Sequence, residues 1–301
     1  RALELLGRVR RVSDLDGARA AFEQALSTAD AAGLALWRLR ALHELGTIEM
    51  FERAGDTRLS QAQRLAGELG AASTGAVIGL QLTAAAMFRF DLDAAGRHAE
   101  SALEASTRLG LGQIRAIVLV FRAEIYALRR DAAEMERYIA QAISAAPGDP
   151  EIEGSALAGA RAVLALLNGD TPRAMDALRR GIAILDSGPP GGPAHYRGLW
   201  PLLLAAHGED TAAEAISHAR AIGLTVNRAN RGFLGYADAI LAGRVGDGSR
   251  ATGLAELSRR FSKWRYAGQR TGRREAADLL RDLHRHRPGR AQGKQSPGEH
   301  R

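Results

Sequence analysis

The chain alternates between alanine-rich stretches, whose apolar residues recur at spacings of three and four, and short polar breaks. This spacing predicts amphipathic helices, such as the one that runs from Ala18 to Ala29. An aspartate returns in successive breaks, 37 to 40 positions after the previous one. The seven aspartates are Asp16, Asp56, Asp93, Asp131, Asp170, Asp210 and Asp247.

Self-similarity at a period of about 38 residues predicts an array of helical hairpins, each of which buries its apolar face against its neighbours. The helix before each aspartate carries the larger side chains, for example Trp37 and Ile48 in one unit and Phe121 and Ile125 in another. We therefore predict an all-α fold, an α-solenoid of about seven hairpins. The hairpins are expected at residues 1–33, 36–70, 74–110, 113–146, 151–186, 195–222 and 227–261.

The ends of the second helices carry recognisable signals. Each recurrent aspartate stands where a second helix begins, so its carboxylate can accept backbone N–H bonds and complement the helix dipole. Glycine is expected to end these helices, at Gly33, Gly110 and Gly223, each followed by leucine, and in a variant form at Gly70. We predict a capping role for the aspartates, because seven caps spread along a superhelix cannot converge on one substrate.

Composition supports close packing of helices. Apolar residues make up 46% of the 301 residues and aromatic residues only 5%, and small residues at regular positions let helices approach closely. The absence of cysteine excludes disulfides and thiolate metal sites and is compatible with the cytoplasm, where we expect the protein. No apolar run approaches the roughly 20 residues that span a bilayer, so no membrane contact is expected.

The positive charge is concentrated at the C-terminus. The formal net charge is +7, but residues 259–301 carry +9 and residues 1–258 carry −2. We predict a helical repeat region over residues 1–261, a basic helical extension over 262–286, and a disordered tail rich in Arg, Pro and Gly over 287–301. The glycine- and proline-rich stretch 187–193 is expected to be a surface loop, with a hinge or an exposed contact site as the alternative. Because the sequence begins with Arg1 inside a helical pattern, we expect a fragment of a longer protein.

Sequence patterns of known catalytic sites are incomplete in this chain. A zinc-protease helix needs two histidines four positions apart, but the stretch that begins at His43 has Thr47 at the second ligand position. Neither lysine, Lys263 or Lys294, follows the glycines of a phosphate-binding loop. A stretch beginning at Gly110 lacks the third glycine of a dinucleotide fingerprint. We therefore expect no enzyme activity, cofactor or metal site.

The remaining expectation is a binding surface. In hairpin arrays the first helices usually line the concave side, and aromatic and arginine side chains are favoured anchors for recognition. Such side chains on the first helices are the candidate binding residues. They are Trp37, Arg38, Arg40, Phe88, Arg89, Arg122, Tyr126, Tyr196, Arg197 and Trp200. The alternative for each is packing between hairpins or exposure to solvent.

Three stretches carry a resemblance to known proteins. Residues 16–26, followed by Ala31-Ala32-Gly33-Leu34, resemble tetratricopeptide-type repeats. The repeat length resembles the superhelical sensor region of large ATP-binding LuxR-type (MalT-like) transcriptional regulators. Residues 195–203 and 226–244 are similar to segments of actinobacterial members of that group. The resemblance covers about residues 1–261; the ATPase and helix-turn-helix modules of the family are absent from this chain, so none of their functional residues can be assigned.

The resemblance implies a non-catalytic sensor. In such a regulator a small effector or a protein segment binds the superhelix, and binding shifts the ATPase module between two states, which requires different affinities for the two. The alternative is a free-standing adaptor that docks protein segments. A third hypothesis, nucleic-acid binding by the basic terminus, would be non-specific and dependent on salt, because that segment lacks the pattern of a recognition helix.

Overall fold

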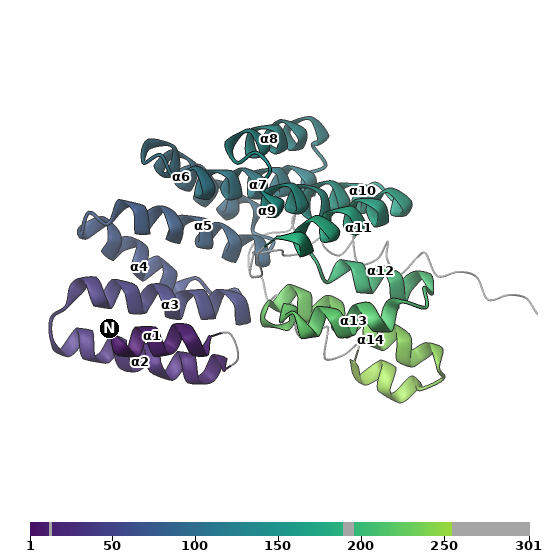
Figure 1. Cartoon of the computed structure of the whole chain (residues 1–301), viewed down its shortest axis with the longest axis horizontal. Helices are drawn as coiled ribbons and strands as arrows, with labels where there is room; N and C mark the ends of the chain where they lie inside the picture. The colour runs from purple at the N-terminus through teal and green to yellow at the C-terminus, as the bar shows by residue number, and fades with distance from the viewer. Residues whose placement is uncertain (12–13, 189–195, 255–301) are drawn as a thin grey trace, which may run out of the picture.

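The computed structural model describes residues 1–11, 14–188 and 196–254, and within these ranges the chain is helical without any β-strand (Figure 1). This confirms the all-α prediction for the described residues. The first eight helices are Ala2–Arg10 (α1), Leu15–Ala31 (α2), Ala35–Arg53 (α3), Thr57–Glu68 (α4), Ala72–Phe88 (α5), Leu92–Arg108 (α6), Gly112–Leu128 (α7) and Ala132–Ala145 (α8).

The second half contains one helix of mixed type. Pro150–Ser155 (α9), the π-helical segment Ala156–Arg161 (η1) and Ala162–Leu167 (α10) follow one another without a break, because the residues between them keep right-handed helical dihedrals. The other elements are Thr171–Ser187 (α11), Leu199–His207 (α12), Ala212–Ala221 (α13), the 3₁₀ turn Leu224–Val226 (η2) and Arg228–Arg244 (α14). Residues 248–254 are also helical.

The helices pack in adjacent pairs in chain order. α1 packs with α2, α3 with α4, α5 with α6, α7 with α8, the α9–η1–α10 helix with α11, and α12 with α13. The pairs begin and end within a few residues of the hairpins expected up to residue 222. The expected basic extension (262–286), the tail (287–301) and most of the loop (187–193) lie outside the described residues.

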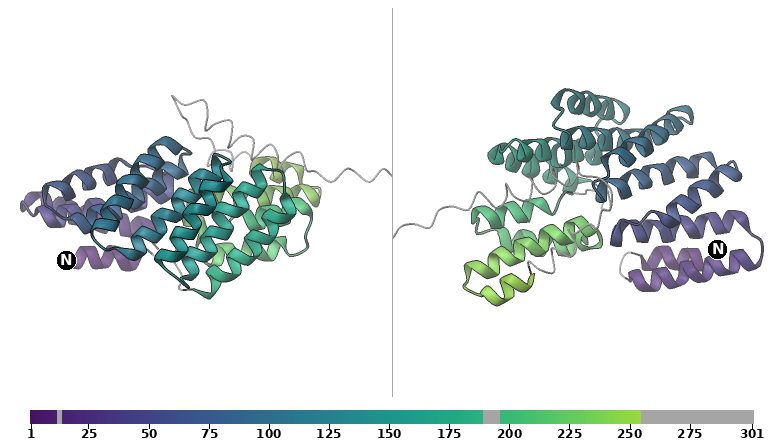
Figure 2. Two further views of the ribbon diagram at one scale, coloured as in Figure 1. Left: turned by 90° about the horizontal axis from the view of Figure 1, so that it is seen from above. Right: turned by 180° about the vertical axis from the view of Figure 1, so that it is seen from behind.

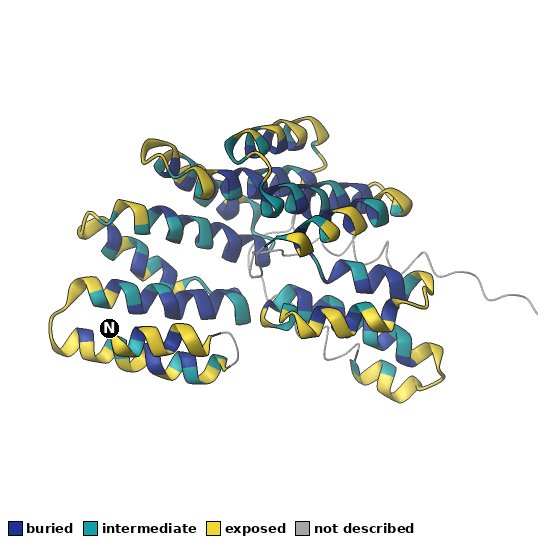
Figure 3. Cartoon of the chain, in the orientation of Figure 1, coloured by how far each residue is buried: buried dark blue, intermediate teal, exposed yellow. Residues whose placement is uncertain are grey.

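The first helices of successive pairs also contact one another, whereas the second helices pack mainly on the first helices beside them in the chain. The pairs follow an arc from α1 and α2 to α14 (Figures 1 and 2). The two sides of this arc meet, because α14 contacts α3 and the Arg231 guanidinium donates to the carbonyl oxygen of Glu52 at 2.8 Å. Buried residues are concentrated on the first helices (Figure 3), and one core cluster extends from Leu39 on α3 to Ala237 on α14.

The helix ends follow the expected chemistry, with a correction to which aspartates act as caps. Asp131 and Asp170 accept backbone N–H bonds at the starts of α8 and α11, and Asp247 does the same ahead of residues 248–254. At α2 and α6 the cap is instead the aspartate two positions earlier, Asp14 and Asp91. In both Asp-Leu-Asp triplets the second aspartate therefore lies in the first helical turn, where it still complements the helix dipole.

Two further aspartates do not cap as predicted. Asp56 stands at the N-cap of α4, but its carboxylate receives no backbone N–H bond there and pairs with Arg89 at 2.5 Å. α13 begins after Thr211, so Asp210 is not its N-cap residue. The predicted glycine ends are confirmed, since Gly33, Gly70, Gly110 and Gly223 all have positive φ angles of 64–76°.

Small residues set the distance between paired helices. Gly154 on α9 and Gly181 on α11 face each other so closely that a Cβ atom on either would lie 2.8 Å from the carbonyl oxygen of the other. A Cβ at Gly181 would also lie 2.8 Å from the backbone nitrogen of Ala158. Backbone atoms cannot move aside as a flexible side chain can, so glycine is required where these two helices cross.

We predict that Gly181→Ala lowers the free energy of unfolding by about 1–3 kcal/mol, because the added methyl group would overlap backbone atoms of the facing helix. Gly96→Ala on α6 is the matched control, since nothing lies within 4 Å of a Cβ placed there. The control should raise the free energy of unfolding by about 0.5–1 kcal/mol, because alanine is the better helix former. Urea denaturation of the two variants and the parent measures both changes; equal effects would contradict the close contact.

The described helices also bear on membrane insertion. None of them combines the length and the apolar character that crossing a bilayer requires.

Candidate functional site

The ten predicted binding residues lie on four parts of the array. Trp37, Arg38 and Arg40 are on the first turns of α3, and the pair at residues 88–89 is at the end of α5. Arg122 and Tyr126 are on α7, and the remaining three are at residues 196–200, around the start of α12. Two of these groups each contribute two side chains to one cavity: Trp37 and Arg40 on α3, and Arg197 and Trp200 around the start of α12.

The α3 group pairs with neighbouring helices. The Arg40 guanidinium lies 5.0 Å from the centre of the Trp37 ring and donates to the Glu4 carboxylate at 2.7 and 3.0 Å. Arg38 forms an exposed ion pair with Asp30 at 3.1 Å. Trp37 and Arg40 line a cavity of about 110 Å³ between α1, α2 and α3. The Arg40–Glu4 contact holds α1 against α3, and the Arg38–Asp30 pair joins α3 to α2.

Phe88 and Arg89, at the end of α5, both contact residues outside α5. Phe88 is buried and its ring centre lies 6.5 Å from that of Phe51. Arg89 donates to the Ala54 carbonyl oxygen at 2.6 Å and pairs with Asp56, so it closes the turn between α3 and α4. The Phe88 side chain thus belongs to the core, and Arg89 links two successive hairpins.

The α7 residues pack on α8 and α6. Tyr126 stacks on Tyr138, with ring centres 5.3 Å apart and planes 13° from parallel. Arg122 donates to the Tyr138 hydroxyl at 2.6 Å and also pairs with Glu100. Both side chains therefore join α7 to α8, and Arg122 also joins α7 to α6.

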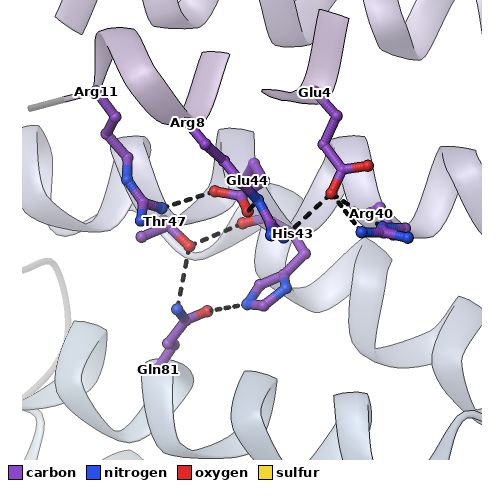
Figure 4. Close-up of polar contacts among 8 residues, drawn as sticks. All are labelled: Glu4, Arg8, Arg11, Arg40, His43, Glu44, Thr47 and Gln81. Atoms are coloured by element: carbon purple, nitrogen blue, oxygen red, sulfur yellow. Dashed lines mark hydrogen bonds and ion pairs between the residues drawn. The ribbon is translucent and has the colours of Figure 1, made fainter. Parts of the chain in front are cut away.

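A polar network joins α1, α3 and α5 (Figure 4). Its core is two buried carboxylates. Glu4 binds Arg8 and Arg40, and Glu44 binds Arg8 at 2.7 Å and Arg11 at 2.6 Å. Because each carboxylate has two guanidinium partners, the cost of burying its charge is offset. This network therefore explains how Glu4 and Glu44 can be buried in the structure.

His43 belongs to the same network, where its ring nitrogen Nε2 lies 2.8 Å from Oε1 of Gln81 on α5. The Gln81 amide donates to the Thr47 hydroxyl at 3.1 Å, and that hydroxyl donates to the carbonyl oxygen of His43. Burial of the imidazole lowers the pKa of His43 below its usual 6.5. The stretch that begins like a zinc-protease helix thus forms a contact between α3 and α5.

A wider cleft lies between α11, α12 and α13. Its volume is about 360 Å³, which is within the usual range for small-molecule sites. Trp200, Pro201 and Leu204 line it from α12, and Ile182 from α11. The other apolar lining residues come from α13 and its C-terminal end: Ala215, Ala219, Ile222 and Leu224.

Positively and negatively charged side chains line one part of this cleft. The Arg197 guanidinium forms an ion pair with Asp186, and the imidazole of His218 lies 3.8 Å from the same carboxylate. Arg197 is largely buried, with 14% of its side chain exposed, whereas Asp186 and His218 are partly exposed at 40% and 58%. Glu214 and Thr211 also line the cleft. The arrangement can hold an apolar group on Trp200 and orient a polar group at the Arg197–Asp186 pair.

Sequence reasoning found Arg197 and Trp200 but missed the partners that complete the cleft. Asp186, Glu214 and His218 come from α11 and α13, whose polar faces look in the sequence like ordinary solvated helix surfaces. Tyr196 is buried and does not line this cleft; it borders a smaller cavity beside it. No local sequence signal connects α11 to α13.

Comparisons with known proteins give no identity for the chain. No model of a known protein family matches the sequence, and none of the curated proteins matches it. In the described part of the chain, no group of three or more His, Asp and Glu residues is placed to hold a metal ion.

We predict that acid weakens the His43 contact. The folded pKa of His43 is lowered, so the unfolded chain takes up the proton first as the pH falls below 6.5. The contribution of the neutral imidazole to the free energy of unfolding is therefore complete above pH 6.5. Below pH 6.5 this free energy falls by up to about 1.4 kcal/mol per pH unit. Urea denaturation between pH 7.5 and 5.5 measures this loss.

The loss should be smaller in His43→Gln than in the parent chain. His207→Gln, which removes an exposed histidine of α12, is the control and should keep the parent's pH dependence. Identical pH dependence in His43→Gln and the parent would show that the His43 contact is not sensitive to protonation.

Proposed function

We propose that this chain is the non-catalytic, ligand-binding region of a signal-sensing protein, built as a solenoid of about seven helical hairpins. The observation that carries the proposal is the cleft of about 360 Å³ between α11, α12 and α13. Its floor is apolar, its aromatic anchor is Trp200, and its polar groups lie together around the Arg197–Asp186 pair. Such a combination of apolar area and a few placed polar groups is typical of sites for small organic ligands.

A compact ligand fits this structure better than an extended peptide. A peptide groove would need accessible side chains along successive first helices. On α5, however, the seven residues from Leu82 to Phe88 are all buried, and most of α7 from Val118 to Leu128 is also buried. The first helices of the pairs therefore offer little continuous exposed surface for a peptide. The cleft, by contrast, is confined to the three helices α11, α12 and α13.

The regulatory part of the proposal rests on the sequence resemblance to LuxR-type regulators. Residues 195–203, which carry that resemblance, include Arg197 and Trp200 of the cleft. A ligand in the cleft would contact three successive helices at once, so it could favour one arrangement of α11, α12 and α13 over another. A change in arrangement requires that the ligand bind the two arrangements with different affinity. The effector would thereby act on the modules that follow or precede this region in a regulator.

We predict that small apolar fragments with one polar group bind the cleft through Trp200. A fragment library is screened by ligand-observed NMR against the full chain, and the hits are titrated. Trp200→Ala should weaken these hits at least tenfold, because truncating a central aromatic anchor commonly costs 2 kcal/mol or more.

Trp37→Ala is the matched control, since it removes the same side chain from α3, outside the cleft. Hits that weaken equally in both variants would point to a general loss of folding. Hits that are unaffected by Trp200→Ala, or a screen without millimolar or better binders, would contradict binding at the cleft.

The regulatory role is tested separately, by immunoblot of source cells with an antibody against this chain. A product several-fold larger than the 32.1 kDa of this sequence, with an ATPase module and a helix-turn-helix encoded in the same reading frame, is expected. A product near 32 kDa would favour a free-standing binding scaffold or adaptor instead.

A further inference from the structure

Glu124 is a buried carboxyl group that lacks the partners given to the other buried acids. It lies in the middle of α7 between Ala123 and Ile125, and only 3% of it is exposed. Its Oε2 atom has no hydrogen-bond partner. By contrast, Glu4 and Glu44 each bind two arginines. A buried carboxyl group without partners costs several kcal/mol of desolvation if it is ionised, so its retention needs an explanation.

Glu124 lines a small cavity between α7, α9, η1 and α11. The cavity has a volume of about 20 Å³, which is enough for one group of the size of a water molecule. It lies against the π-helical segment η1, a type of irregularity that often marks functional sites. Gly159 of this segment makes room for the carboxyl group, because a Cβ there would lie 2.2 Å from Glu124 Oε1.

Other residues with oxygen-bearing side chains line the same cavity. Glu151 and Ser155 contribute from α9, and Tyr196 contributes from the segment before α12. Glu151 also has a buried carboxyl oxygen, Oε1, without a hydrogen-bond partner. The basic residue at the cavity, Arg197, is paired with Asp186 in the neighbouring cleft. Two carboxyl groups thus border a space of one-water size without a cation of their own.

We propose that this cavity binds a primary ammonium group, either as a free ammonium ion or as the end of an amine ligand. Such a group carries three or four N–H donors, and four residues with oxygen-bearing side chains line the cavity: Glu124, Glu151, Ser155 and Tyr196. Among the described residues no group of three or more His, Asp and Glu is placed to hold a metal ion, so an ammonium group suits this pair of glutamates better than calcium or magnesium, which prefer more oxygen ligands. The apolar walls, formed by Ile117, Val120, Phe121, Ile152, Ala158 and Leu185, strengthen the attraction between ammonium and carboxylate.

Ammonium would take the place of a proton on Glu124. Burial raises the pKa of this carboxyl group from 4.5 to about 8, so at neutral pH the empty site holds Glu124 in its protonated form. The other titratable or charged groups that border the cavity are Glu151, Tyr196 and Arg197. Burial also raises the pKa of Glu151, and burial together with Glu124 raises that of Tyr196 well above 10. An ammonium group therefore binds as Glu124 releases its proton, and its affinity rises with pH up to about 8.

The experiment measures thermal unfolding of the full chain at pH 8 with ammonium chloride or methylammonium chloride. Tetramethylammonium chloride at the same ionic strength is the reference, because this cation has no N–H donor and is too large for the cavity. Ammonium several-fold above its dissociation constant should raise Tm by about 2–4 °C over the reference. Butylammonium chloride distinguishes the two sources: an equal rise indicates the end of an amine ligand, and a rise confined to ammonium and methylammonium indicates a free ion.

Glu124→Gln should abolish the rise, because the neutral amide cannot balance the charge of the ammonium group. Glu104→Gln is the matched control, since it removes the same charge from an exposed position on α6, and it should keep the rise. A negative result at the Glu124 cavity would not count against ligand binding in the cleft between α11, α12 and α13. The ammonium proposal does not depend on that cleft.

Calorimetry of the unmodified chain gives a second readout that needs no variant. Ammonium binding at pH 7, in buffers of different ionisation enthalpy, should release close to one proton per ion. No rise in Tm, the same rise in Glu124→Gln, the same rise with potassium chloride, or binding without proton release would each overturn the proposal.

Discussion

The structure depends on how closely successive helices can approach one another. None of the described α-helices exceeds 19 residues, and most have a single apolar stripe, so their stability comes from packing and not from the helix alone. The contact faces are made largely of alanine and glycine, with Ala18, Ala62, Ala95 and Ala99 fully buried. Where two glycines face each other, at Gly154 and Gly181, the backbones themselves are in contact. The larger side chains of the first helices then fill the interior that this spacing leaves.

Against this apolar interior, the buried polar groups fall into two kinds. Those of α1, α3 and α5 are paired, and they hold neighbouring hairpins in register at little net cost. Glu124 and Glu151 are of the second kind, because each has an oxygen atom without a partner beside a space that can hold a small group. The paired groups are explained by the fold, and the unpaired oxygens of Glu124 and Glu151 support the proposed ammonium site.

The sequence predicted the helices well but not which distant side chains would lie together, for a physical reason. Helix type and length follow from the local spacing of apolar residues, so the paired helices up to residue 222 lie where the pattern placed them. The ends were harder: Ala54, Phe90 and Arg130 adopt positive φ angles where glycine would be expected, and Asp14 caps α2 in place of Asp16. Tertiary packing overrides local preference at such positions.

Partners distant in the chain could not be predicted at all. The cleft brings together α11, α12 and α13, and nothing in the spacing of Asp186 or His218 indicates that they would face Arg197. Glu124 did leave a signal, as a single acidic residue within the apolar stretch from Ala116 to Ala127. A single acidic residue in a largely buried helix is therefore a signal that sequence analysis can use.

The contact between α14 and α3 has a consequence for how this array folds. In an open solenoid each unit touches only its neighbours, so nucleation can occur anywhere and spread. The bond from Arg231 to Glu52 spans 179 positions, and closing so long a loop carries an entropy cost that adjacent pairs do not have. The contact between α14 and α3 should therefore form late in folding, after the helix pairs between them have formed. Once it is made, force applied at either end must break this non-local contact before the arc can straighten.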